Sequence, residues 1–267
     1  MTERTATETT TATATPASEL RVAVLGARGR MGSEAARAVR HADGLLLVAE
    51  LDHEDSLEVL VAAGAQVVID FTVPSVTEHN VRFAVEHGIH CVVGTTGWDD
   101  EGLDRTRALL AQHQGVGVLI APNFSVGAVL AMRFSAQAAR FFESVEIVEL
   151  HHPDKVDAPS VTAARTAALV GEARRAAGVA PSPDATKQDP DGARGALVDD
   201  VRVHSVRLRG LVAHQETLLG NTGEQLTIRH DSFDRISFMT GVVLGVRGVV
   251  SHPGLTHGLE DYLDLGL

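Results

Sequence analysis

The first half of the chain alternates short apolar runs with amphipathic stretches. Apolar runs that end in glycine or polar residues are typical of buried parallel strands, and we expect such strands at 22–25, 45–51, 67–72, 90–93 and 116–120. The stretches between them repeat their apolar positions at helical period and predict helices at 33–41, 57–63, 77–88 and about 100–112. This alternation predicts a parallel sheet with helices on both faces.

The pattern changes after Asn123. Here we expect a long helix at 126–142, a strand at 145–150 and a helix at about 160–177, followed by a proline-rich loop at 181–195. Strands are predicted at 201–208, 211–219 and 225–230, with a hairpin turn between the last two, and a helix at 238–249 ends the substantial structure. This half therefore predicts helices on one face of a mixed sheet.

A glycine-rich turn follows the first strand. Gly26, Gly29 and Gly32 are spaced by three residues and lead into a helix, which is the arrangement that cradles a pyrophosphate. The second strand ends at Asp52, about 20 residues later, where a carboxylate can accept hydrogen bonds from an adenosine ribose. The alternative is a tight turn with no ligand, but its context favours a dinucleotide site.

Composition narrows the possible partners. The net charge of −12 argues against nonspecific binding to nucleic acid or to an anionic membrane. The single cysteine, Cys91, excludes an intramolecular disulfide and suits a reducing cytoplasm. Residues 2–19 consist almost entirely of Thr, Ala, Glu, Ser and Pro, so we expect a disordered tail without a signal peptide.

Polar groups gather after the predicted strand 145–150. His151, His152 and Lys155 are followed within seven residues by Ser160 and Thr162 at a predicted helix start. An imidazole can donate a proton, and an ammonium with helix N–H groups can bind a carboxylate. The alternative is an ordinary polar loop. No metal site is expected, because adjacent strand residues point to opposite faces.

Five segments together resemble 4-hydroxy-tetrahydrodipicolinate reductases of the diaminopimelate–lysine pathway, particularly those of actinobacteria. They are G-A-R-G-R-M-G from Gly26, D-F-T from Asp70, G-T-T-G from Gly94, A-P-N-F-S-V-G from Ala121 and E-L-H-H-P-D-K-V-D-A-P-S from Glu149. The likeness begins at Leu20 and continues past Thr256. It implies NAD(P)H-dependent reduction of a small acidic cyclic imine by a homotetramer that assembles through its C-terminal sheets.

The resemblance also assigns roles. It implies His151 as proton donor, Lys155 as second catalytic cation, and His152, Ser160, Val161 and Thr162 as substrate contacts. The residues implied to hold the dinucleotide are Gly26, Arg28, Gly29, Arg30, Met31, Gly32, Asp52, Phe71, Gly94, Thr95, Thr96, Ala121, Pro122, Asn123 and Phe124. Asp52 favours NADH, whereas Arg28, Arg30 and His53 can attract the 2′-phosphate of NADPH, so we expect both cofactors to bind.

These expectations combine into one fold class: α/β, with a Rossmann-like doubly wound parallel sheet and an α+β substrate and oligomerisation domain with a mixed sheet. The predicted domains are a tail at 1–19, a dinucleotide-binding domain at 20–124 completed by 236–267, and a substrate-binding and tetramerisation domain at 125–235.

The chain departs from the family at Val161, where the family has glycine, and at Thr240, where related actinobacterial chains have proline. If φ at residue 161 were positive, valine would strain the loop or displace the substrate carboxylate. Two alternatives to a lysine-pathway reductase are therefore open: a paralogue that reduces another cyclic imine or enamine acid, and a catalytically silent NAD(H)-binding sensor.

Overall fold

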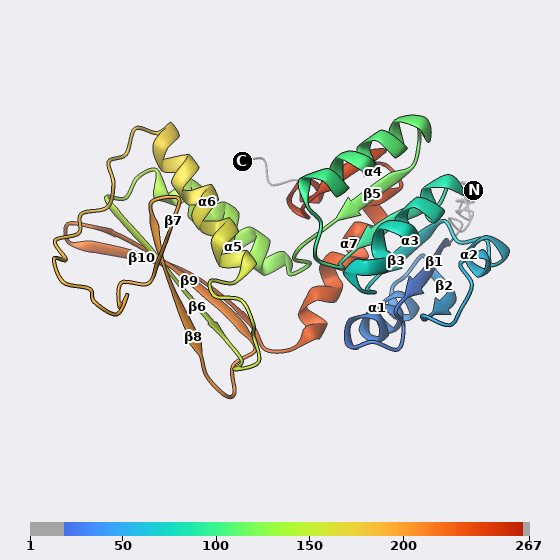
Figure 1. Ribbon diagram of the computed structural model, residues 1–267, viewed down its shortest axis with the longest axis horizontal. Helices are drawn as coiled ribbons and strands as arrows, with labels where there is room; N and C mark the ends of the chain where they lie inside the picture. The colour runs from blue at the N-terminus through green and yellow to red at the C-terminus, as the bar shows by residue number, and fades with distance from the viewer. Residues whose placement is uncertain (1–18, 264–267) are drawn as a thin grey trace, which may run out of the picture.

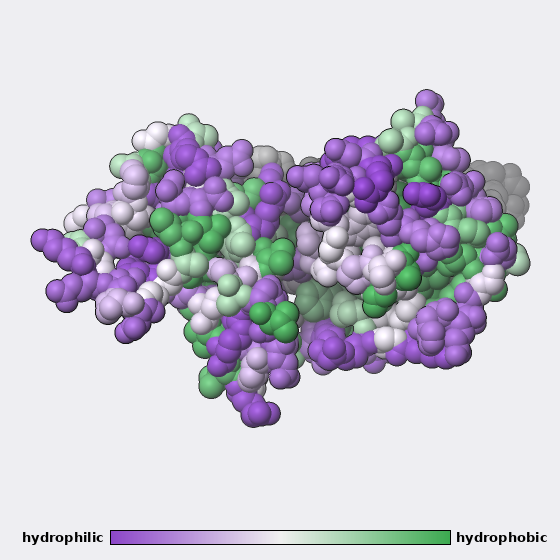
Figure 2. Space-filling model, viewed as in Figure 1, coloured by the Kyte–Doolittle hydropathy of each residue, from purple (hydrophilic) through white to green (hydrophobic). Residues whose placement is uncertain are grey.

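A computed structural model describes residues 19–263. The predicted tail lies outside the described residues, apart from its last residue. The chain forms two lobes, each built on its own sheet (Figure 1). Figure 2 shows hydrophilic residues over most of both lobes on this face, with scattered hydrophobic residues between them.

The first sheet has six parallel strands in the order β11-β5-β4-β3-β1-β2. Their bounds are β1 (Leu20–Leu25), β2 (Leu45–Leu51), β3 (Val67–Asp70), β4 (His90–Val93), β5 (Gly117–Ile120) and β11 (Gly254–His257). The predicted doubly wound parallel sheet is confirmed. The prediction that substantial structure ends at Val249 is wrong, because β11 lies beyond it and pairs with β5.

Helices cover both faces of this sheet, because alternate strand residues supply two separate cores. On one face, α1 (Arg30–His41) and α7 (Met239–Val249) pack on residues such as Val24 and Ile69. On the other, α2 (Glu58–Ala62), α3 (Pro74–Glu86) and α4 (Asp100–Gln112) pack on residues such as Leu25 and Val68. The capping carboxylate of α4 is that of Asp99, which accepts the N–H of Gly102 at 2.8 Å.

The second sheet is mixed, in the order β10-β9-β6-β8-β7. Its strands are β6 (Ser144–His151), β7 (Ala196–Val198), β8 (Val201–Arg207), β9 (Ala213–Asn221) and β10 (Glu224–Ser232). Only β6 and β8 run parallel; the other neighbours are antiparallel. The short edge strand β7 was not predicted, since three residues at the end of a polar loop carry almost no periodicity.

The helices α5 (Val126–Ala139) and α6 (Val161–Ala176) lie against one face of the second sheet (Figure 1). Strand alternation places Val148, Leu150, Val206 and Leu218 on the opposite face, where each is partly exposed. Two short 3₁₀ turns, η1 (Arg235–Phe238) and η2 (Glu260–Tyr262), flank α7 and β11. No helix among residues 19–263 is long and apolar enough to cross a membrane.

Candidate functional site

The turn between β1 and α1 is shaped by its glycines. Gly26 has a φ of +73°, and a Cβ there would stand 2.6 Å from the carbonyl oxygen of Phe71. A Cβ on Gly32 would stand only 2.0 Å from the carbonyl oxygen of Gly26. The N-cap of α1 is Gly29, and no side chain caps this helix. Its first N–H groups are therefore available to an anion, so the turn fits a pyrophosphate.

Asp52 follows β2 and lies beside this turn. Its Oδ2 accepts the backbone N–H of Arg28 at 2.8 Å and lies 3.8 Å from the Nε of the same residue. Arg28 and Arg30 themselves are exposed. A carboxylate beside two exposed guanidinium groups suits a ribose hydroxyl as well as a 2′-phosphate.

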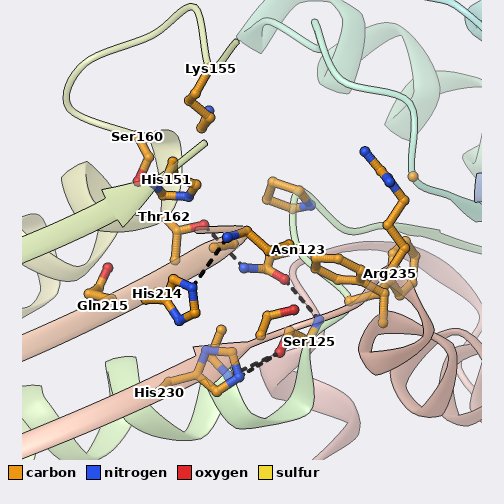
Figure 3. A pocket seen from close by; sticks show the side chains of 18 of the residues that line it. Asn123, Ser125, His151, Lys155, Ser160, Thr162, His214, Gln215, His230 and Arg235 are labelled. Atoms are coloured by element: carbon orange, nitrogen blue, oxygen red, sulfur yellow. Dashed lines mark hydrogen bonds between the residues drawn. The ribbon is translucent and has the colours of Figure 1, made fainter. Parts of the chain in front are cut away.

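A cavity of about 350 Å³ lies between the two sheets, and Figure 3 shows part of its lining. It joins residues that the family resemblance assigns to the dinucleotide with residues that it assigns to catalysis and to the substrate. The first group is Met31, Phe71, Gly94, Ala121, Pro122, Asn123 and Phe124. The second is His151, His152, Lys155, Ser160 and Thr162.

Nine predicted site residues lie outside this cavity. Thr95, Thr96 and Val161 line a neighbouring cavity of about 370 Å³, which shares Pro122 and Asn123 with the first. The turn residues 26, 28–30 and 32, together with Asp52, lie at the β1–α1 end of the molecule and do not line either cavity.

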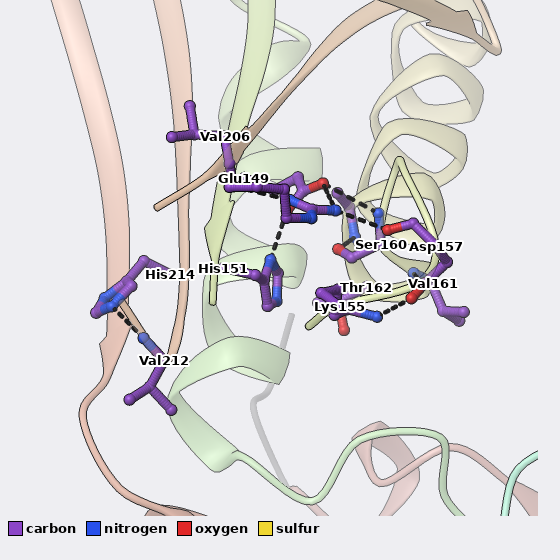
Figure 4. A network of polar contacts seen from close by, with 12 residues as sticks. Glu149, His151, Lys155, Asp157, Ser160, Val161, Thr162, Val206, Val212 and His214 are labelled. Atoms are coloured by element: carbon purple, nitrogen blue, oxygen red, sulfur yellow. Dashed lines mark hydrogen bonds and ion pairs between the residues drawn. The ribbon is translucent and has the colours of Figure 1, made fainter. Parts of the chain in front are cut away.

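Glu149 is fully buried and holds the ring of His151 from above in the view of Figure 4. Its Oε2 binds Nδ1 of His151, and Arg207 donates to both of its carboxylate oxygens at 2.9 and 2.8 Å. Burial alone would raise the pKa of the Glu149 carboxyl, but the hydrogen bonds from His151 and Arg207 outweigh it and lower that pKa to about 2. Glu149 is thus ionised at every physiological pH, and it fixes Nδ1 of His151 as a donor.

With Nδ1 held by Glu149, the other ring nitrogen of His151 is left for the cavity that the residue lines. Strand β6 ends at His151, so His152 escapes the strand alternation and lines the same cavity. The expectation that the two rings face opposite sides is therefore wrong for His152. Even so, no group of three or more His, Cys, Asp or Glu side chains among residues 19–263 is placed to hold a metal ion.

Val161 is the first residue of α6, and its side chain is exposed. The only described non-glycine residues with positive φ are Asp199 and Asp200, so the φ of Val161 is negative. The condition of a positive φ, under which a strained valine is expected at this position, is therefore not met. The N–H of Val161 donates to Oδ2 of Asp157 at 3.2 Å, and Oδ1 of the same carboxylate pairs with Nζ of Lys155.

Asn123 connects the two lobes. Its Nδ2 donates to Oγ1 of Thr162 at 3.1 Å, and its Oδ1 accepts the N–H of Ser125 at 2.8 Å (Figure 3). The second bond fixes which end of the amide faces Thr162. Because Thr162 accepts from Asn123, its own hydroxyl proton is free to point to a ligand.

Other residues that line the cavity were missed, because they lie far along the chain. Arg235 comes from η1 and lies on the opposite side of the view in Figure 3 from His151 and Lys155. Gln215 presents a buried Oε1 that lacks a hydrogen-bond partner, and His214 is buried with Nδ1 2.7 Å from Oδ1 of Asp231. The polar residues that could have pointed to these positions are H-Q-E from His214 and D-R from Asp234. The hydrophobic pattern alone predicts them to be ordinary strand and loop residues.

Comparison with known proteins places this geometry in a family. Residues 20–124 match the model of the N-terminal part of dihydrodipicolinate reductase, and residues 127–263 match that of its C-terminal part. Curated 4-hydroxy-tetrahydrodipicolinate reductases of Nocardia farcinica and Streptomyces griseus are each 63% identical, over 92% and 93% of this chain and 99% of their own lengths.

A solved structure gives the same result. The dipicolinate-bound dihydrodipicolinate reductase of Paenisporosarcina superposes with a TM-score of 0.83 at 38% identity, covering 92% of this chain and all of that one. With relatives of this name at such identity, neither the paralogue nor the sensor alternative is favoured. The chain belongs to the dihydrodipicolinate reductase family.

Proposed function

We propose that this protein reduces 4-hydroxy-tetrahydrodipicolinate to tetrahydrodipicolinate with NADH or NADPH, in the diaminopimelate–lysine pathway. The observation that carries the proposal is the imidazole of His151, held by the ionised Glu149 and lining a cavity that reaches Gly94 and Phe71 of the dinucleotide lobe. The two relatives named above carry the same activity in their names.

The substrate is a cyclic dicarboxylate, and the cavity has a separate cation for each end of such a molecule. Lys155 and Thr162 lie on one side and Arg235 on the other. We assign one carboxylate to Lys155, the hydroxyl of Thr162 and the start of α6, and the second to Arg235. Two anchors fix both the position and the tilt of the ring, and holding the reacting groups in a fixed orientation lowers the barrier of such a reaction.

The net reaction replaces a ring hydroxyl by hydrogen, so it consumes a hydride and a proton and releases water. When bound, the reduced dinucleotide supplies the hydride. His151 supplies the proton from Nε2, and Glu149 stabilises the imidazolium before that transfer. Arg207 keeps Glu149 from taking the proton itself, because it holds the carboxylate in its ionised form.

We further propose a homotetramer in the cytoplasm. The face of the second sheet opposite α5 and α6 carries Val148, Leu150, Val206 and Leu218, an apolar surface suited to packing against another copy. The free, buried Cys91 is compatible with a reducing compartment. Sedimentation velocity of the wild type tests the oligomeric state: a sedimenting species of four chains is expected, and a monomer at micromolar concentration contradicts it.

Oxidation of NADH and NADPH in the presence of freshly prepared 4-hydroxy-tetrahydrodipicolinate tests the activity. A panel of monocarboxylate cyclic imines serves as the control, because each lacks one of the two anions that the cavity is proposed to hold. We expect turnover on the dicarboxylate to be roughly 30- to 150-fold faster, since one missing charged contact costs about 2–3 kcal/mol. Faster turnover on a monocarboxylate would overturn the assignment.

A further inference from the structure

We infer that the carboxylate of Asp157 holds the place that a substrate carboxylate takes, so that Asp157 sets the affinity and charge selectivity of this site. The inference rests on the proposed function, because it concerns the same anion-binding donors. It adds a residue to which neither the sequence nor the family resemblance assigned a role.

Two donors from different elements converge on this one carboxylate (Figure 4). Nζ of Lys155 pairs with Oδ1, and the first N–H of α6, that of Val161, donates to Oδ2 at 3.2 Å. These are an ammonium and a helix N-terminus, the two groups that the sequence predicts can bind a carboxylate. A ligand carboxylate that binds both donors must displace Asp157 from the N–H of Val161, because a backbone N–H is a single donor; at Lys155 it competes with Asp157 for an ammonium that has three N–H groups.

The main chain of Asp157 can remain in place during such an exchange. Its carbonyl oxygen accepts a hydrogen bond from Nη2 of Arg207 at 2.6 Å, and Arg207 is in turn held by the buried Glu149. The side chain of Asp157, by contrast, is about one third exposed, at 35%. Rotation about its two side-chain bonds is therefore enough to move the carboxylate from the donors into water.

The exchange also selects for charge. Burial alone would raise the pKa of the Asp157 carboxyl, but the hydrogen bond and charge of Lys155, together with bonds from backbone N–H groups, outweigh it and the pKa is lowered overall. Asp157 is therefore an anion at neutral pH, and a neutral ligand group cannot offer Lys155 an equivalent partner. An acidic ligand can, although it must first overcome both the occupied donors and the repulsion of a like charge.

Binding of dipicolinate tests the inference. This planar dicarboxylate is the molecule named with the Paenisporosarcina reductase, and its dissociation constant can be measured by calorimetry with NADH present. Asp157→Asn removes the charge but keeps an oxygen that can accept the N–H of Val161. We expect it to bind dipicolinate about tenfold more tightly than wild type, equal to about 1.4 kcal/mol.

Asp154→Asn is the matched control. Asp154 lies on the same loop and is exposed, and no side-chain hydrogen bond or ion pair of it occurs among the described residues. The control removes the same charge three residues away, so we expect it to alter the dissociation constant less than twofold. Equal or weaker binding by Asp157→Asn would overturn the inference, as would an equal gain in the control.

Making Asp157→Asn in a Lys155→Met protein distinguishes two explanations of tighter binding: displacement of the Asp157 carboxylate by the ligand, and loss of charge repulsion between Asp157 and the ligand. In Lys155→Met, the donor that both carboxylates share is gone, so the gain from Asp157→Asn should shrink to about threefold or less. An undiminished tenfold gain would overturn the exchange, because charge alone would then explain it. Unfolding temperatures of all variants verify that the α6 start is intact.

Failure of the proposed function would be seen in a different measurement, the activity assay. The wild-type protein would then bind NADH but not turn over 4-hydroxy-tetrahydrodipicolinate. The ratio of dipicolinate affinities still decides the role of Asp157 in that case. Binding by Asp157→Asn alone would support it, and binding by neither protein would overturn it.

Discussion

The Nδ1 atom of His151 is bound by Oε2 of Glu149, a carboxylate that is wholly buried two residues earlier on the same strand. Residues i and i+2 of a strand lie on one face, so β6 itself aligns the pair. Arg207 on the parallel neighbour β8 is registered opposite His151 and closes the network from the side.

Glu149→Gln is expected to lower kcat about a hundredfold or more and to leave the dissociation constant of NADH unchanged. A neutral amide neither stabilises the imidazolium nor fixes the tautomer of His151, and general acid catalysis contributes about 10²–10⁴-fold. Steady-state kinetics with cofactor calorimetry measures both quantities. Glu146→Gln, on the same strand but on the opposite face, is the control and should retain kcat within about threefold.

The same carboxylate makes stability depend on acid. The folded-state pKa of Glu149 is about 2 and its ordinary value is 4.5, so the ionised form contributes stability above pH 4.5 that is lost as the pH falls toward 2. The difference in unfolding free energy between wild type and Glu149→Gln should be on the order of 3 kcal/mol above pH 4.5. Urea unfolding between pH 4.5 and pH 2 should show this difference in unfolding free energy shrinking as the pH falls. A difference that grows on acidification would contradict the ion-pair network.

Val161→Gly is expected to change kcat/KM on the proposed substrate less than about threefold. The residue has negative φ at the start of α6, its side chain is exposed, and glycine would keep the N–H that donates to Asp157. A gain of tenfold or more in the glycine variant would show that the valine does obstruct the substrate.

Gly29 and Gly32 should respond differently to alanine. A Cβ at Gly32 meets the Gly26 carbonyl oxygen at 2.0 Å, so Gly32→Ala must disturb the turn and lower the unfolding temperature by several degrees. A Cβ at Gly29 stands 3.1 Å from the same atom, a tight contact that a small shift relieves. Gly29→Ala should therefore keep most of the stability and lose cofactor affinity about tenfold or more, because the methyl group projects where the pyrophosphate is proposed to bind. Unchanged NADH affinity in folded Gly29→Ala would remove the turn from the cofactor site.

The sequence predicted most strands of both sheets but missed β7 and β11, because the spacing of apolar residues identifies only strands and helices that are long enough to show a period. It also predicted that His151, Lys155 and Thr162 lie in one site, because these residues fall within twelve positions of the chain. Arg207 was missed as the partner of Glu149, from which it is 58 residues distant. Only the parallel register of β6 and β8 joins them, and pairing between distant strands has no local signal. Arg235 and Gln215 were missed likewise, and the φ of Val161 could not be read from a family comparison alone.

Two histidines side by side provide the most direct test of the account. His151→Gln and His152→Gln alter neighbouring rings that line the same cavity, but only His151 is bound to Glu149. With 4-hydroxy-tetrahydrodipicolinate and saturating NADH, we predict that His151→Gln loses about a hundredfold or more in kcat while its affinity for NADH is unchanged. His152→Gln should instead act mainly on KM. Full turnover by His151→Gln on this substrate would contradict the assignment of the proton donor, and with it the proposed reaction at this cavity.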